Sequence, residues 1–149
     1  MSETIQPGQT AVVLGAGGFL GSHVADALSN AGYKVRLFDR NPSPFRRSDQ
    51  EMIIGDLMDI SQVSNAVQGA AAVYNFAAIA DIDEAHDNPL GTASINVLGN
   101  MHALEASRLA GVRRFIFASS VYVYSETGSF YRASKQAAGS FTEPYHERY

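Results

Sequence analysis

A glycine-rich turn follows the first apolar run of the chain, and it constrains the fold more than any other feature of the sequence. Residues 10–14 form an apolar, β-forming run, and the segment GAGGFLG follows at residues 15–21. Gly15 can adopt the positive φ of a tight turn, Gly18 lets the backbone come close to a pyrophosphate, and Gly21 lets the next helix pack against the strand. The pattern therefore predicts a strand, a phosphate-binding turn and a helix, and a glycine-rich turn without a ligand is the alternative.

The helix that follows this turn contributes its backbone N–H groups to the expected phosphate site. Phe19 and Leu20 occupy its first turn, where N–H groups have no partner within the helix. A helix amino terminus also carries partial positive charge, so these groups attract an anion. We therefore expect both residues to contact the phosphates.

Short apolar runs alternate with helical patterns along the rest of the chain, and this alternation predicts parallel strands joined by helices. We expect an α/β fold of the Rossmann type: a doubly wound parallel sheet of about five strands, with right-handed crossovers and helices on both faces. The nucleotide crevice is then expected at the carboxyl ends of the first and fourth strands. The expected strands cover residues 10–14, 34–38, 52–54, 71–76 and 112–118, and the expected helices cover residues 19–31, 60–68, 90–110 and 130–141.

Several local features refine this expectation. Asp59 or Ser61 is expected to cap the second helix, and Pro144 is expected to interrupt the last helix because proline removes a hydrogen bond. Residues 81–87 are interpreted as a solvated acidic loop over the crevice, because they lack the fixed ligand spacing of a metal site. Tyr122 and Tyr124 alternate with valines, which predicts an extension of the fifth strand.

Composition narrows the class of protein. The chain has 149 residues, a net charge of −4 and no cysteine, which suits one domain and excludes a disulfide framework, a zinc–thiolate site and a cysteine nucleophile. The acidic balance argues against a nucleic-acid partner. No apolar run reaches the ~18 residues of a membrane span, and residues 1–10 are too polar for a signal peptide, so we expect a cytoplasmic protein with no membrane partner.

Two acidic residues follow expected strands on the adenosine side of the crevice. Asp39 ends the second strand, where a carboxylate can accept hydrogen bonds from both ribose hydroxyls and repels a 2′-phosphate, which favours NAD over NADP. The neighbouring Arg40 could instead bind that phosphate, and a solvated aspartate is the interpretation without a ligand. Asp56, followed by Leu57, comes after the third strand; it could accept from the exocyclic amine of adenine or cap the next helix.

A tyrosine and a lysine stand four residues apart in the segment YRASK, which places Tyr131 and Lys135 on one face of the last helix. An ammonium beside a phenol stabilises the phenolate electrostatically, as a tyrosine base requires. Ser119 and Ser120 end the fifth strand, where a serine hydroxyl can hold a substrate oxygen. The alternatives are a surface pair on a helix and two serines that merely end a strand.

These motifs together resemble the extended short-chain dehydrogenase/reductase superfamily, and within it the NAD-dependent epimerase/dehydratase family that acts on nucleotide sugars. The resemblance extends from about residue 10 to the end of the chain. The motifs that carry it, in order, are the glycine turn, Asp39, Gly55-Asp56-Leu57, Asn75-Phe76-Ala77-Ala78, Asn96-Val97-Leu98-Gly99, Ser119-Ser120 and YRASK.

The resemblance implies roles for particular residues. Ser120, Tyr131 and Lys135 are the implied catalytic residues, with Tyr131 as the base and Lys135 also bound to the nicotinamide ribose. The implied reaction is a transient hydride transfer between bound NAD and a UDP-, dTDP- or GDP-sugar, followed by epimerisation or loss of water. No metal is expected. The cofactor-binding residues expected in total are Gly15, Gly18, Phe19, Leu20, Gly21, Asp39, Arg40, Asp56, Leu57, Phe76, Ala77, Ala78, Asn96, Ser119, Tyr131 and Lys135.

The resemblance also bears on domain organisation. Residues 1–149 are expected to be an NAD-binding Rossmann domain, either an N-terminal fragment or a truncated member, because the family's later strands and substrate-binding C-terminal domain are absent. Ser120 and Tyr131 are only 11 residues apart, which implies a trimmed loop near the sugar. A homodimer through helices 90–110 and 130–142 is one expectation, and packing within the chain explains their apolar faces equally well. A non-catalytic dinucleotide-binding module and a small NAD(P)-dependent carbonyl reductase are the alternative functions.

Overall fold

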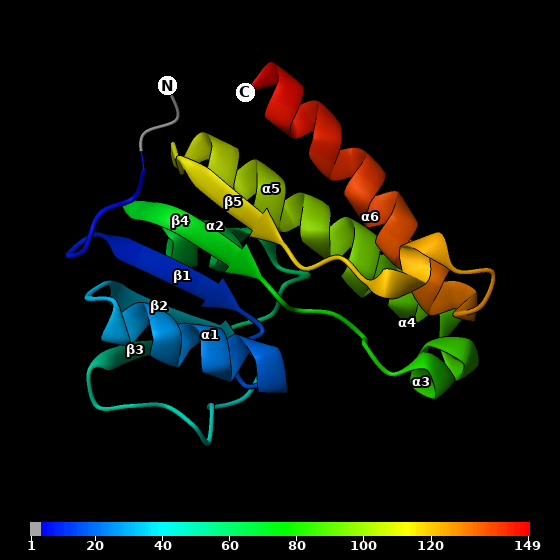
Figure 1. Ribbon diagram of the computed structural model, residues 1–149, viewed down its shortest axis with the longest axis horizontal. Coiled ribbons are helices and arrows are strands. Elements are labelled where there is room, and N and C mark those ends of the chain that lie inside the picture. The colour runs from blue at the N-terminus through cyan, green and yellow to red at the C-terminus, as the bar shows by residue number, and fades with distance from the viewer. Residues whose placement is uncertain (1–3) are drawn as a thin grey trace.

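Five parallel strands form one sheet in the order β3-β2-β1-β4-β5, in the computed structural model that describes residues 4–149 (Figure 1). The order reverses between β1 and β4, so a crevice opens there at the carboxyl ends of the strands. The expected fold and its switch point are confirmed. Residues 1–3, which belong to the polar segment considered above for a signal peptide, lie outside the described part. The strands are β1 (Thr10–Leu14), β2 (Lys34–Asp39), β3 (Gln50–Ile54), β4 (Ala70–Asn75) and β5 (Arg114–Phe117).

The central strand β1 explains how the sheet is buried on both faces. It pairs with β2 and β4 in parallel register, and alternate side chains point to opposite faces. Val12 and Leu14 belong to the core cluster beneath α2 (Ile60–Val67) and α5 (Asn100–Leu109), whereas Ala11 and Val13 pack toward α1 (Phe19–Asn30) on the other face. Figure 1 shows α1 on one side of the sheet and α5 on the other. Because both faces of β1 are covered, its sequence is a continuous apolar run without polar alternation.

The long helix expected over residues 90–110 is divided into three consecutive segments: α4 (Pro89–Ala93), the π-helix η1 (Ser94–Gly99) and α5. A π-helical turn accommodates an extra residue, which rotates the side chains that follow. The cause lies in Asn96, whose buried amide exchanges hydrogen bonds with both backbone groups of Ile79 in the loop after β4. This tertiary contact cannot be inferred from helical periodicity.

Four strands differ from expectation in their boundaries, and β2 ends at Asp39 rather than at residue 38. β3 begins at Gln50 rather than at residue 52, because the buried Gln50 side chain donates to Asp26 and Ser29 of α1. β4 covers residues 70–75 instead of 71–76, and β5 covers only 114–117 instead of 112–118. The N–H groups of Arg113 and Ala118, just outside β5, still donate to the carbonyl oxygens of Ala71 and Asn75 in β4.

Two segments expected as a loop and a strand extension are helical. Residues 81–87 form the short helix α3 (Ile82–Asp87), because the Asp81 carboxylate accepts from two backbone N–H groups of the first turn. Val121–Tyr124 form the 3-10 helix η2, and the Ser120 hydroxyl accepts from the Tyr122 N–H at its start, 3.3 Å away. The expected extension of β5 through Tyr122 and Tyr124 is therefore wrong.

The last helix, α6 (Ser129–Arg148), continues through Pro144, contrary to expectation. Proline leaves the carbonyl of Ser140 without its helical partner, but Ser140 and Pro144 are both exposed, so water can satisfy that carbonyl. The helical turn beyond Pro144 is tied to α5, since the Tyr145 hydroxyl donates to the Glu105 carboxylate at 3.1 Å. α6 thus lies beside α5 along its length (Figure 1). No helix among residues 4–149 combines the length and the apolar character needed to cross a membrane.

Candidate functional site

The glycine turn is held tightly against the end of β4. Gly15 has a φ of +78°, as the sequence predicts, and a Cβ atom there would lie 2.5 Å from the backbone nitrogen of Ala77. A Cβ atom at Gly21 would overlap the carbonyl oxygen of Gly15. At Gly18 the added atom meets only ordinary contact within the chain. The first and third glycines are therefore required by packing, whereas Gly18 leaves space on the side that faces outward.

The amino terminus of α1 is open to a ligand. No side chain caps this helix, whose N-cap residue is Gly18. The residues that follow, Phe19 and Leu20, are exposed, so their backbone N–H groups remain available. The structure thus has the uncapped helix terminus that a phosphate group requires.

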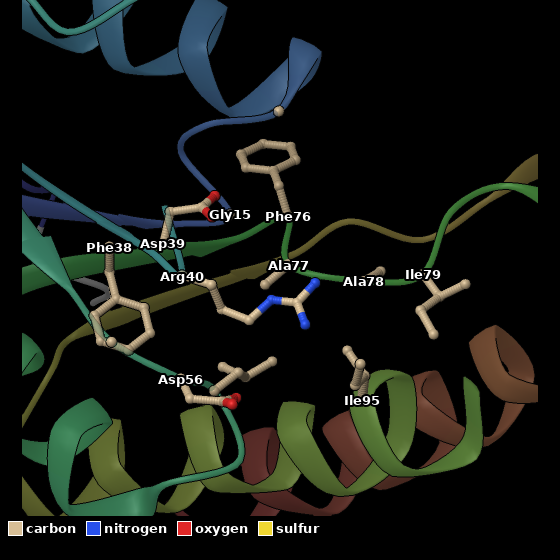
Figure 2. A pocket seen from close by; sticks show the side chains of 13 residues that line it. Gly15, Phe38, Asp39, Arg40, Asp56, Phe76, Ala77, Ala78, Ile79 and Ile95 are labelled. Atoms are coloured by element: carbon tan, nitrogen blue, oxygen red, sulfur yellow. The ribbon is translucent and has the colours of Figure 1, made fainter. Parts of the chain in front are cut away.

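Asp39 connects this turn to β2. Its Oδ2 accepts from the Gly17 N–H at 2.9 Å, and its Oδ1 accepts from the Asn41 N–H at 3.3 Å. The next residue, Arg40, extends from the same strand end across the pocket toward Ala77 (Figure 2). Its guanidinium makes no hydrogen bond or ion pair with any other described residue. A carboxylate and a guanidinium without a partner among the described residues therefore stand side by side at the carboxyl end of β2.

A pocket of about 170 Å³ lies at the carboxyl edge of the sheet (Figure 2). Strands β1, β2, β3 and β4 all end at it, and η1 forms the opposite wall. The sequence predicts most of this lining but not the contributions of Phe38, Gly55, Ile79 and Ile95. The residues that line the pocket are Gly15, Gly18, Phe38, Asp39, Arg40, Gly55, Asp56, Leu57, Phe76, Ala77, Ala78, Ile79 and Ile95.

Two roles were considered for Asp56, contact with adenine and capping of the next helix, and the structure excludes the second. Asp59, as one of two expected candidates, caps α2 by accepting from the N–H groups of Ser61 and Gln62. Asp56 caps no helix; its Oδ1 accepts from the Met58 N–H at 2.9 Å, and the residue is exposed at the pocket edge. The helix-cap interpretation of Asp56 is therefore wrong, and its contact with adenine stays a prediction.

Lys135 and Tyr131 meet on the inner face of α6, as their spacing predicts. The Lys135 Nζ donates to the carbonyl oxygen of Ala118 at 2.8 Å and lies 5.0 Å from the ring centroid of Phe117 and 5.9 Å from that of Tyr131. Lys135 is only 5% exposed, and this burial lowers the pKa of its ammonium from 10.5 to about 8. A cation is thus held next to the phenol ring in a protected site.

Tyr131 is buried beside the pocket rather than in its lining. Its ring packs with Ile79 and Ala85, with Ile95 at the edge of the same cluster. Ile79 and Ile95 also line the pocket, so the two sites share a wall. The Tyr131 hydroxyl has no hydrogen-bond partner among residues 4–149 and is not one of the buried polar atoms that lack one, so it keeps access to solvent.

The serines lie at the end of β5, but no hydrogen bond joins either to Tyr131 or Lys135 within the described chain. Ser120 accepts from the Tyr122 N–H with its Oγ, which leaves the hydroxyl proton available to a ligand. Ser119 is exposed. The structure therefore brings the tyrosine and lysine together and leaves the serines nearby without a bond to them.

Buried asparagines hold the site together, and their role is not evident from the sequence. Asn96, expected near the cofactor, is 3% exposed; its amide donates to Ile79 and Ser134 and accepts from Ile79. Asn75 at the end of β4 donates to Asn100 of α5 at 2.9 Å. Polar amides at apolar positions of a helical pattern are the signal that could have found this network, because a buried amide must be hydrogen-bonded.

The fold and the pocket define the class of protein. A glycine turn at the switch point of a doubly wound parallel sheet, next to an uncapped helix and a strand-end carboxylate, is a dinucleotide-binding domain of the Rossmann type. Residues 11–149 match the NAD dependent epimerase/dehydratase family, and the chain belongs to this family.

Individual relatives show how much of a family member this chain represents. It is 30% identical over 125 residues to a UDP-glucose 4-epimerase of Rhizobium leguminosarum bv. trifolii, covering 78% of this chain and 37% of that protein. It is 32% identical over 146 residues to a 3 beta-hydroxysteroid dehydrogenase/Delta 5→4-isomerase of Mycobacterium tuberculosis, covering 93% and 37%. The structure of MoeE5 in complex with UDP-glucose and NAD superposes with a TM-score of 0.85 at 28% identity, covering 93% of this chain and 50% of that one. The chain thus spans at most half the length of these NAD-dependent family members.

Proposed function

We propose that this chain is the NAD-binding part of a nucleotide-sugar epimerase or dehydratase, with Tyr131 as the catalytic base. The observation that carries the proposal is the shared wall between the two sites. Ile79 and Ile95 line the pocket on one side and pack against Tyr131 on the other. A dinucleotide that starts at Asp39 and continues along this wall therefore brings its far end to Tyr131 and Lys135.

The residues of the pocket suit NAD. The glycine turn and the uncapped start of α1 would hold the pyrophosphate. The Asp39 carboxylate would accept from the adenosine ribose hydroxyls, and its negative charge disfavours a 2′-phosphate. Phe76, Ala77 and Ala78 would form the apolar wall along the cofactor.

In the proposed reaction, NAD supplies a reversible hydride acceptor. Tyr131 would remove the proton of the substrate hydroxyl, because the Lys135 cation beside it stabilises the phenolate. Ser120, whose hydroxyl proton is uncommitted, would hold the substrate oxygen during this step. Lys135 would also contact the nicotinamide ribose, and its bond to Ala118 fixes its direction.

The substrate class and assembly are part of the same proposal. MoeE5 is described in complex with UDP-glucose, which supports a UDP-sugar as the first substrate to test here.

We further propose a cytoplasmic homodimer through α4–α5 and α6, which is supported by exposed apolar side chains such as Leu90 and Phe141 on these helices.

Two measurements test the proposal. Calorimetric titration with NAD should show binding by the wild-type chain, and Tyr131→Phe should retain that affinity because only a hydroxyl is removed. NADH fluorescence directly after mixing with UDP-glucose should rise transiently for the wild type, because the hydride is later returned to the sugar, and should not rise for Tyr131→Phe. Tyr124→Phe, at a position 94% exposed, is the matched control and should behave as wild type.

The outcomes separate the parts of the proposal. A wild-type chain that does not bind NAD would contradict the cofactor assignment. Equal NADH formation by wild type and Tyr131→Phe would contradict the role of the base while leaving NAD binding intact.

A further inference from the structure

His102 reaches from α5 to the loop that lines the pocket between β3 and α2. Its Nδ1 atom lies 3.0 Å from the carbonyl oxygen of Leu57. Because a carbonyl oxygen only accepts, Nδ1 must carry the proton and donate to it. Leu57 is buried and lines the pocket, so this hydrogen bond connects a helix residue to the pocket wall.

Gly99 holds the same leucine from one turn earlier on the helix. A Cβ atom at Gly99 would lie 2.7 Å from Cδ2 of Leu57, a distance that real Cβ contacts do not reach. The absence of a side chain at Gly99 therefore lets Leu57 occupy its position. The helix thus holds the leucine backbone through His102 and leaves room for its side chain at Gly99.

The residue before this leucine carries the group that can recognise a base. Asp56 uses its N–H to donate to Gln62 and its Oδ1 to accept from Met58. Its Oδ2 has no partner within residues 4–149. Figure 2 shows this carboxylate at the edge of the pocket. The direction of the free oxygen depends on the loop backbone, which His102 holds at the next residue.

We infer that His102 is a positioning residue for adenine recognition. By fixing the carbonyl of Leu57, it orients Asp56 so that Oδ2 accepts a hydrogen bond from the exocyclic amine of adenine. This inference rests on the proposed function, because it requires NAD in the pocket. It extends that function to a residue that touches neither cofactor nor substrate.

The test compares NAD with nicotinamide hypoxanthine dinucleotide, in which a carbonyl oxygen replaces the adenine amine. Asp56 cannot accept from that oxygen, so the wild-type chain should bind NAD more tightly than the analogue. His102→Leu keeps an apolar side chain of similar reach but no donor, and it should weaken NAD by roughly two- to tenfold, the range of one hydrogen bond. Binding of the analogue should be much less affected. The dissociation constant of the analogue divided by that of NAD should therefore fall toward one.

Three further variants separate positioning from a general structural effect. His102→Asn retains a donor and should keep the wild-type ratio. Gly99→Ala pushes on the Leu57 side chain from the same helix and should lower the ratio as His102→Leu does. His146→Leu, the same exchange at an exposed position of α6, should change nothing.

The outcomes are distinguishable. NAD binding with an unchanged ratio in folded His102→Leu and Gly99→Ala, or equal wild-type affinity for both dinucleotides, would overturn the role of His102 alone. A wild-type chain that binds neither dinucleotide would overturn the proposed function, and this inference with it.

Discussion

The Lys135 ammonium donates a hydrogen bond to the carbonyl oxygen of Ala118 at 2.8 Å, and this contact joins the middle of α6 to the end of β5. The ammonium has no acidic partner among the described residues and lies between the rings of Phe117 and Tyr131. Burial of a cation without a counter-ion disfavours its charged form. The buried Lys135 ammonium therefore lowers the free energy of unfolding of the chain.

Replacement of Lys135 by methionine should stabilise the free chain at neutral pH. The pKa falls from 10.5 in the unfolded chain to about 8 in the folded one, so between these values the unfolded chain binds more protons and the free energy of unfolding of the wild type rises with pH. Below pH 8 the buried Lys135 ammonium lowers the free energy of unfolding by the full amount, on the order of 3 kcal/mol for a pKa shift of this size. Lys135→Met removes it and should be more stable by up to that amount.

Urea denaturation of both chains at several pH values between 7 and 10 measures this difference. The advantage of Lys135→Met should shrink as the pH rises through 8 toward 10.5. Burial raises the pKa of Tyr74 and of Tyr145, but those effects are common to both chains and cancel in the difference. A stability difference between the two chains that does not vary with pH would show that burial does not lower the pKa of Lys135.

Asp39→Asn should shift the preference of the pocket from NAD toward NADP. The asparagine Oδ1 can still accept from the Gly17 N–H, which keeps the bond to the turn. The negative charge and the longer bond from the Asn41 N–H are lost. The unpaired Arg40 guanidinium then faces a 2′-phosphate without competition, and charge effects of about 1–2 kcal/mol correspond to roughly a tenfold change in the affinity ratio. Calorimetric titration with both cofactors measures the ratio.

Arg40→Ala in the Asp39→Asn background is the matched control for that experiment. It should reduce NADP affinity selectively and leave NAD affinity nearly unchanged. If NADP binding does not depend on Arg40, the guanidinium is not the phosphate partner.

Gly15→Ala should be more destabilising than Gly69→Ala, although both glycines have a positive φ, of +78° and +68°. A left-handed conformation costs an alanine about 1–2 kcal/mol at either site. At Gly69 the added Cβ meets open space, whereas at Gly15 it would strike the backbone of Ala77. We expect Gly15→Ala to cost at least about 3 kcal/mol, since backbone must move. Equal free energies of unfolding for the two variants would contradict the close approach of β1 and β4.

The elements that depend on local pattern are those the sequence predicts well. The apolar run of β1, the glycine turn and the spacing of Tyr131 and Lys135 each carry a periodic or steric signature, and the structure places them as expected. Strand order also follows, because alternating strands and helices leave few allowed topologies.

The features that sequence could not supply depend on partners far away in the chain. The π-helix η1 exists because Asn96 bonds Ile79 in the loop after β4. α6 passes through Pro144 because Tyr145 reaches Glu105. In each case a tertiary hydrogen bond overrides a local preference, and neither periodicity nor propensity records such a bond.

Asn96→Leu should destabilise the chain and loosen the wall between the pocket and Tyr131. The leucine fills a similar volume, but it leaves the N–H and carbonyl of Ile79 without their partner. The Ser134 hydroxyl loses the bond from Asn96 and keeps its bond to the Tyr131 carbonyl. Each buried group left unpaired costs about 1–3 kcal/mol, so the two groups of Ile79 should lower the free energy of unfolding by about 2–6 kcal/mol.

Ser134→Ala removes the bond from Asn96 and the bond that the Ser134 hydroxyl donates to Tyr131, but it keeps both bonds to Ile79. It serves as the graded control, with an expected decrease of about 1–2 kcal/mol. Urea denaturation gives the stabilities, and near-ultraviolet circular dichroism reports the packing of Tyr131 with Ile79. Asn96→Leu should reduce the aromatic signal of the folded chain, because Ile79 no longer has its anchor. An unchanged spectrum together with wild-type stability would show that the loop after β4 holds its position without Asn96, and that the π-helix has another cause.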